Sequence, residues 1–226
     1  MSILYLVASP IGNLEDMTFR AVEVLKQVDR IACEDTRRAR ILLRRHNITA
    51  PLEVYHDRNQ ARVTPRLVHV LNAGNSIALL TDAGSPGVSD PGYTLVRAAV
   101  AAGVPVIPIP GPSAVIAAVT ASGLPCDRFV FEGYLPRGTA KRRKRLTALQ
   151  VEERTIVVYI SPHRCAKELG ELASALGDRP ACLAREMTKI YEEFRRAPLG
   201  DLAQWAREHK VRGELTLVIA GLQSVR

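Results

Sequence analysis

The residues best suited to chemistry lie in a loop rich in glycine, proline and aspartate that directly follows a short apolar run. The whole stretch, residues 79–92, reads LLTDAGSPGVSDPG. A short apolar run is typical of a buried parallel strand, while glycine permits close approach by a ligand and proline stiffens a loop. Ligands of open α/β sheets bind beyond the carboxyl ends of strands, so we expect a binding loop here. The alternative is a ligand-free strand-to-helix connection, which normally needs only about 2–6 residues.

Two carboxylates follow another predicted strand, residues 31–33. Glu34 and Asp35 precede a helix expected over residues 37–45, which carries five arginines. A carboxylate can serve as a general base. Acidic residues also cap helix N-termini, so capping and function both remain open for this pair. The arginines suit either a solvated helix face or contact with phosphate.

Three further polar stretches occupy ends of predicted elements. Pro110-Gly111-Pro112-Ser113 follows a strand over residues 104–109, and Ser113 can cap the next helix or donate to a ligand. In the second half, a polar cluster over residues 185–189 follows a strand at 181–184, and His163 lies at a helix start. Residues 137–145, RGTAKRRKR, form the most basic stretch. We predict a mobile arm that contacts phosphate, with a solvated loop as the alternative.

Strand, loop and helix alternate five times before Gly123, which predicts an α/β domain with a mostly parallel sheet. Within it, Asp16 is expected to cap the first helix, and Thr64 to cap a helix that starts at Pro65. The pattern changes after Gly123, so we predict a boundary there. The fold class is therefore α/β, with an N-terminal domain over residues 1–123, a mixed α/β domain over 124–226, and a ligand cleft between them.

Composition and motifs exclude several classes of protein and of functional site. The formal charge of +8 favours an acidic partner, with nucleic acid ahead of a membrane surface. No GxxxxGK[ST], GxGxxG, GxSxG or HExxH motif occurs, and the five histidines are too dispersed for a metal site. Four scattered cysteines suit free thiols in a reducing cytoplasm. The uncharged segment 98–126 is interrupted by prolines, which argues against a membrane span, and no secretory signal is recognised.

Eight short stretches, in this order, resemble the tetrapyrrole methylase superfamily and, within it, the ribosomal RNA small subunit methyltransferase I group. They are residues 9–14 (SPIGNL), 34–37 (EDTR), 82–86 (DAGSP), 90–92 (DPG), 110–113 (PGPS), 161–164 (SPHR), 185–189 (REMTK) and 212–214 (RGE). The resemblance covers nearly the whole chain, from about residue 3 to residue 220. Each motif is weak alone, but the ordered set is specific.

This resemblance implies a homodimer that holds S-adenosylmethionine (SAM) between two α/β domains and uses no metal. The implied reaction methylates the ribose 2′-hydroxyl of a decoding-centre cytidine in small-subunit (16S) ribosomal RNA. By motif match, the cofactor site is expected to include Ser9, Pro10, Gly12, Asp82, Ala83, Gly84, Ser85, Pro86, Pro112, Ser113, Arg185 and Glu214. The basic stretch would then contact RNA phosphates.

A ribose hydroxyl is a poor nucleophile while protonated, so a general base is expected. The candidates are Glu34, Asp35, Glu186 and Lys189, which the sequence does not rank. The sequence departs from the group's pattern in two places. It has Ile160 where the group often has an acidic residue, and it stops soon after residue 221, whereas some members continue into a further helical segment. Two other functions stay open: methylation of a tetrapyrrole precursor, and RNA binding without catalysis.

Overall fold

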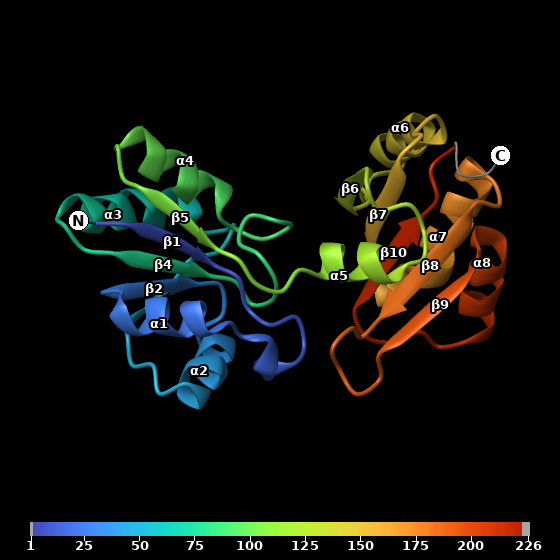
Figure 1. Ribbon diagram of the computed structural model, residues 1–226. Helices are drawn as coiled ribbons and strands as arrows, with labels where there is room; N and C mark the ends of the chain where they lie inside the picture. Colours follow the sequence, from blue (N-terminus) through green and yellow to red (C-terminus); the bar gives the residue numbers. More distant parts are fainter. Residues whose placement is uncertain (1, 223–226) are drawn as a thin grey trace. The chain divides into compact units, whose positions relative to one another are not determined.

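The computed structural model describes residues 2–222 and shows two compact units, Met1–Ser113 and Ala114–Arg226 (Figure 1). Helix α5 (Ala114–Ala121), expected in the first domain, packs against a strand of the second unit. The division thus falls at the start of α5, whereas the sequence pattern changes at its end, near Gly123. No helix within residues 2–222 has the length and apolar character needed to cross a membrane.

The first unit is built on a five-stranded sheet of order β3-β2-β4-β1-β5 in which every pairing is parallel. Its strands are β1 (Leu4–Val7), β2 (Arg30–Cys33), β3 (Leu52–Val54), β4 (Ile77–Leu80) and β5 (Val106–Ile109). Its helices are the short η1 (Leu14–Asp16), α1 (Phe19–Gln27), α2 (Thr36–Arg45), α3 (Gln60–Asn72) and α4 (Tyr93–Ala101). The predicted parallel sheet is confirmed.

Helices cover both faces of this sheet. Ala78 and Leu80 of β4 pack with α1 and α2, while Ile77 and Leu79 pack with α3 and α4. All four side chains of β4 are buried. Burial on both faces explains why this strand reads as an uninterrupted apolar run.

Two helix starts differ from the predictions. Thr18 rather than Asp16 caps α1, because its hydroxyl accepts the Ala21 amide at 3.2 Å while Asp16 lies in η1. Helix α3 begins at Gln60, five residues before Pro65. Thr64 does not cap it, because its buried hydroxyl pairs with the Tyr55 hydroxyl at 3.1 Å.

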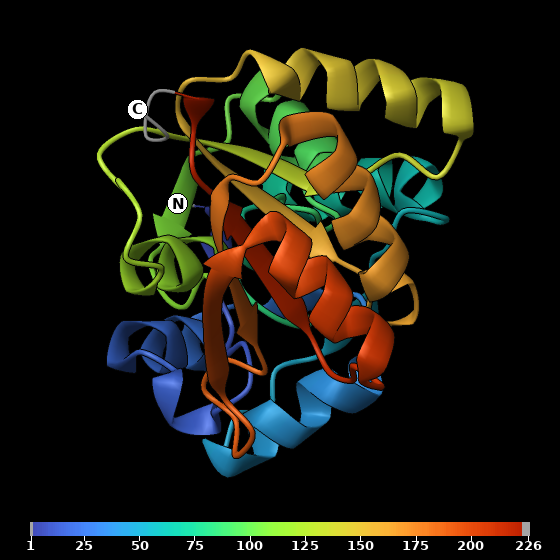
Figure 2. The same cartoon turned by 90° about the vertical axis from the view of Figure 1, so that its right-hand side faces the viewer.

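The second unit has a mixed sheet of order β6-β7-β10-β8-β9, in which only β6 and β7 are parallel. Its strands are β6 (Phe129–Tyr134), β7 (Thr155–Ile160), β8 (Pro180–Arg185), β9 (Glu193–Pro198) and β10 (Leu215–Ile219). Besides α5, its helices are α6 (Thr139–Gln150), η2 (Pro162–Arg164), α7 (Cys165–Leu176) and α8 (Leu199–Glu208). Helices α6, α7 and α8 share one apolar core with the sheet. Figure 2 shows α7 and α8 lying in front of its strands.

Strand β9 was not predicted, because its sequence EFRRAP is that of a polar edge strand. Charged residues are a common way to protect an exposed sheet edge, and they remove the apolar signal.

The prediction of a mobile arm over residues 137–145 is wrong. From Thr139 onwards the segment is helical, and Arg142 is buried against acidic partners. Its guanidinium donates to Glu168 at 2.9 Å and to Glu171 at 2.7 Å, both on α7. Arg145 pairs with Glu132 of β6. Carboxylates from elements distant in sequence thus neutralise two of the arginines and hold the helix to its unit.

Candidate functional site

Loops from several strands of the first unit meet at one edge of its sheet. The loop after β1 and the loop after β4 are joined by a reciprocal backbone pair, Ser9 N to Gly84 O at 2.9 Å and Gly84 N to Ser9 O at 3.0 Å. Buried hydroxyls reinforce this junction. The Ser9 hydroxyl donates to Thr81 O at 2.9 Å, and the Thr81 hydroxyl donates to Gly84 O at 2.7 Å. These bonds hold both loops in a defined conformation.

The loop after β5 reaches the same place and approaches closely enough to require glycine. A methyl group at Gly111 would lie 3.0 Å from the Ala8 Cβ, a separation that real Cβ atoms rarely show. At Gly84, where φ is +78°, the Cβ position is 3.9 Å from Pro112 O. The structure therefore brings together Ser9, Gly84 and Pro112 from three predicted cofactor segments. Pro10, Gly12, Asp82, Ala83, Ser85, Pro86 and Ser113 belong to the same loops.

Asp82 links the β4 loop to the one after β2. Its Oδ1 accepts the Asp35 amide at 3.3 Å, and its Oδ2 lies 3.4 Å from the Arg38 guanidinium. Asp35 caps α2 by accepting the Arg37 amide at 2.8 Å, so the capping interpretation is confirmed. Its hydrogen bonds with Arg37 hold the pKa of the Asp35 carboxyl well below its usual range. Asp35 is therefore a weak base.

Carboxylates that follow β2, β3 and β4 share one electrostatic environment. Burial raises the pKa of Asp90 to about 7, with repulsion from Glu34, Asp82 and Asp57 adding to the effect. Burial also raises the pKa of Glu34, again with a contribution from Asp82. A carboxylate with a raised pKa is the better proton acceptor near neutral pH. Asp90 was not among the predicted catalytic residues, because the burial and the neighbouring carboxylates that raise its pKa come from parts of the chain distant in sequence.

The remaining predicted residues form a polar cluster in the second unit. The Glu186 amide donates to Glu214 O at 2.9 Å, and the Glu214 amide donates to Glu186 Oε1 at 2.8 Å. Lys189 Nζ bridges the two carboxylates at 2.9 and 3.1 Å. Arg185 pairs instead with Glu193 at 3.2 Å. Glu186, Lys189 and Glu214 are thus brought together, with Arg185 beside them at the end of β8.

The protonation states of this cluster suit binding better than proton transfer. The Glu214 amide lowers the pKa of Glu186. Burial lowers the pKa of Lys189, but its hydrogen bonds to Glu186 and Glu214 outweigh that effect and leave the pKa raised. Both groups are therefore charged at neutral pH, one as a weak base and the other as an ammonium without a free lone pair.

The backbone of the same cluster is strained. Glu186 and Thr188 have positive φ values of 49° and 66°, which non-glycine residues adopt only where surrounding structure compensates. Gly213 has φ +89°, and a methyl group there would overlap the Glu186 side chain. Glycine at position 213 thus leaves room for the Glu186 carboxylate. Within residues 2–222 no group of three or more His, Cys, Asp or Glu side chains could hold a metal ion.

Comparisons with known proteins agree with the motif order. The profile of the family Tetrapyrrole (Corrin/Porphyrin) Methylases matches residues 3–203. The chain is 51% identical over 222 residues to a Synechocystis sp. protein named Ribosomal RNA small subunit methyltransferase I, covering 98% of this chain and 80% of that protein. A protein of the same name from Halalkalibacterium halodurans is 47% identical over 218 residues, covering 96% and 75%.

A solved structure shows the same fold at lower sequence identity. It is a uroporphyrin-III C-methyltransferase from Thermus thermophilus complexed with S-adenosylhomocysteine. The comparison of the two structures gives a TM-score of 0.67 at 20% sequence identity and covers 100% of both chains. The likeness shows the fold. The family profile and the two relatives identify the chain as a member of the tetrapyrrole methylase family, in its ribosomal RNA small subunit methyltransferase I group.

Proposed function

We propose that this chain is a SAM-dependent methyltransferase that methylates the RNA of the small ribosomal subunit. The observation that carries this proposal is the identity of 47–51% to proteins named for that activity, over at least 96% of the chain. The structural likeness to a methyltransferase crystallised with S-adenosylhomocysteine supports the choice of cofactor.

The joined loops of the first unit fit SAM chemically. Gly111 is exposed and has no side chain, so its peptide group lies at the surface of the loop after β5, and peptide groups can hydrogen-bond an adenosine. The carboxylates of Glu34, Asp82 and Asp90 lie near this edge of the sheet and favour a cation. SAM carries a sulfonium and an ammonium, so its charge suits the site. Asp82, which holds two of the loops together, is the residue we expect to matter most.

We propose the ribose 2′-hydroxyl of a decoding-centre cytidine as the methyl acceptor, on the basis of the motif resemblance. The sulfonium of SAM supplies an activated methyl group, so the protein must align the hydroxyl and accept its proton. Glu34 and Asp90 are the strongest candidates for that base, because their pKa values are raised. Asp35, Glu186 and Lys189 are less suited, because their interactions stabilise the charged forms.

The decisive experiment measures transfer of labelled methyl groups from SAM to small ribosomal subunits that lack their decoding-centre methylation. A tetrapyrrole precursor is tested in parallel. We expect the label on a ribose 2′-oxygen of the RNA. A label on the tetrapyrrole, or RNA binding without transfer, would refute the proposal in favour of a precursor methyltransferase or a non-catalytic RNA-binding protein, respectively.

We further propose that the protein acts as a homodimer, as the family resemblance implies, and that it does so in the cytoplasm, where its four free thiols stay reduced. Light scattering of the purified chain should give twice the monomer mass of 24.8 kDa. A monomer mass at micromolar concentration would contradict the dimer.

A further inference from the structure

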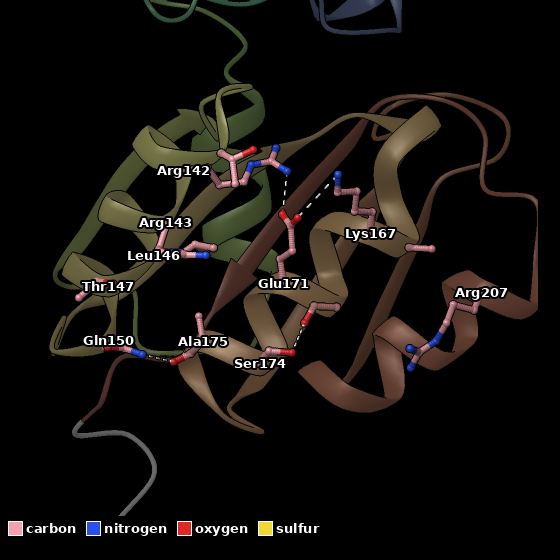
Figure 3. Close-up of a pocket in the computed structure, with 13 residues that line it drawn as sticks. Arg142, Arg143, Leu146, Thr147, Gln150, Lys167, Glu171, Ser174, Ala175 and Arg207 are labelled. Atoms are coloured by element: carbon pink, nitrogen blue, oxygen red, sulfur yellow. Dashed lines mark hydrogen bonds and ion pairs between the residues drawn. The ribbon is translucent and has the colours of Figure 1, made fainter.

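An open groove crosses the helical face of the second unit. It has a volume of about 790 Å³ and lies between α6 and α7, with one wall residue from α8. Besides Arg142, its cationic residues are Arg143 on α6, Lys167 on α7 and Arg207 on α8, and these three side chains are drawn around the same hollow in Figure 3. Cations from three helices thus line one depression.

These cations differ from Arg142, which also lines the groove but whose guanidinium is already paired with carboxylates. Arg142 is buried and pairs with Glu168 and Glu171. Arg143 and Arg207 are exposed, and neither side chain makes a hydrogen bond or ion pair with any residue of the described chain. Lys167 has a single long contact of 3.9 Å to Glu171, whose other oxygen accepts from Arg142. The anionic group in the groove is therefore already neutralised, and the free charge is positive.

A second hollow of about 430 Å³ lies beside the groove. The two share Ala166 and Lys167, so they adjoin on the helical face of the second unit. The second hollow adds Lys210 and His163, both exposed. We call the cations Arg143, Lys167, Arg207 and Lys210, with the two hollows that they line, the basic groove.

We propose that the basic groove binds the phosphate backbone of the RNA substrate, an inference that rests on the proposed function. A row of exposed cations along two adjoining hollows matches a linear polyanion, and phosphate contacts supply most of the sequence-independent affinity of RNA-binding proteins. Small residues on α7, namely Ala166, Gly170 and Ser174, keep its floor open.

The lining favours RNA over an acidic protein. Protein interfaces are enriched in aromatic anchors. Neither hollow is lined by a Phe, Tyr or Trp residue, and Thr147 and Gln150 add polar groups to the wall. Such a lining suits phosphate and ribose better than apolar side chains.

The test compares the variant R143Q/R207Q with R20Q/R62Q. The control loses the same charge from exposed arginines on α1 and α3 of the first unit. Binding of both variants and the wild type to an unmethylated decoding-centre RNA fragment is measured by filter binding between 50 and 300 mM KCl. We expect R143Q/R207Q to bind about 5- to 30-fold more weakly. Its slope of log affinity against log salt should be about 1.4 units shallower. SAM affinity, measured by calorimetry, should match the wild type.

The outcomes separate this inference from the proposed function. Wild-type methyl transfer to the RNA, together with unchanged RNA affinity of R143Q/R207Q, would overturn the inference and leave the function standing. An equal loss in R20Q/R62Q would also overturn it, because the effect would then be one of net charge. Weakened binding to whole subunits but not to the RNA fragment would assign the groove to an acidic protein. Failure of the wild type to bind the fragment would overturn the inference, and failure to transfer methyl groups to whole subunits would overturn the proposed function as well.

Discussion

Replacing Arg142 with alanine should destabilise the second unit by about 3 kcal/mol. The side chain is 9% exposed and makes three hydrogen bonds, to Glu168, to Glu171 and to Pro136 O. Removing one partner of a buried ion pair costs about 3–5 kcal/mol, because the other charge is left buried. Glu168 is fully buried but also accepts from the Arg164 guanidinium at 2.9 Å. That remaining partner places the expected cost at the lower end of the range.

The chain offers a specific probe for this measurement. Trp205 is the only tryptophan and lies in α8, so its fluorescence in a urea titration follows the second unit. The matched control is Arg143→Ala, one residue along the same helix but exposed, for which we expect a change within about 0.5 kcal/mol. A loss below about 1 kcal/mol for Arg142→Ala, or equal losses for both variants, would refute the view that Arg142 has a structural role.

Three further predictions concern residues in the candidate site. Gly213→Ala should cost at least about 2 kcal/mol, because its φ is +89° and the methyl group would overlap the Glu186 side chain. In urea titrations Gly138→Ala, with open space around its Cβ position, should cost much less, and equal costs would refute the steric argument. Asp82→Ala should weaken SAM binding about tenfold in calorimetry, because two loops lose their link. Unchanged affinity would count against the proposed cofactor site. Asp90 has a pKa of about 7 in the folded chain, against an ordinary value of 3.8. Between these two pH values the folded chain holds a proton on Asp90 that the unfolded chain has lost, so the free energy of unfolding should fall as pH rises from about 4 to about 7. Asp90→Asn should flatten that part of the urea midpoint profile, and an unchanged profile would contradict the assignment.

The sequence alone determined the architecture of the first unit and the family. Apolar runs such as β4 are continuous because both faces of a parallel sheet are covered, and this signal is local. Glycine, proline and aspartate after those strands indicated where loops would meet, because all parallel strands end at the same edge. The ordered motifs were sufficient to identify the tetrapyrrole methylase family, which the comparisons confirm.

Local signals failed where a contact between two elements decided the structure. Thr64 before Pro65 is an ordinary helix start, but a hydrogen bond with Tyr55 gives the hydroxyl another role. The β9 edge strand carries charged side chains and lacks the apolar alternation of a half-buried strand. In both cases tertiary packing outweighed the local preference.

Only the tertiary structure decided which charges are free and which are paired. Arg142 and Arg143 are neighbours in the most basic stretch, but only Arg142 meets carboxylates, 26 and 29 residues further along the chain. Asp90 owes its raised pKa to burial and to carboxylates that follow other strands. The energy of a charge depends on burial and on neighbours within a few ångströms, and the fold sets both of them.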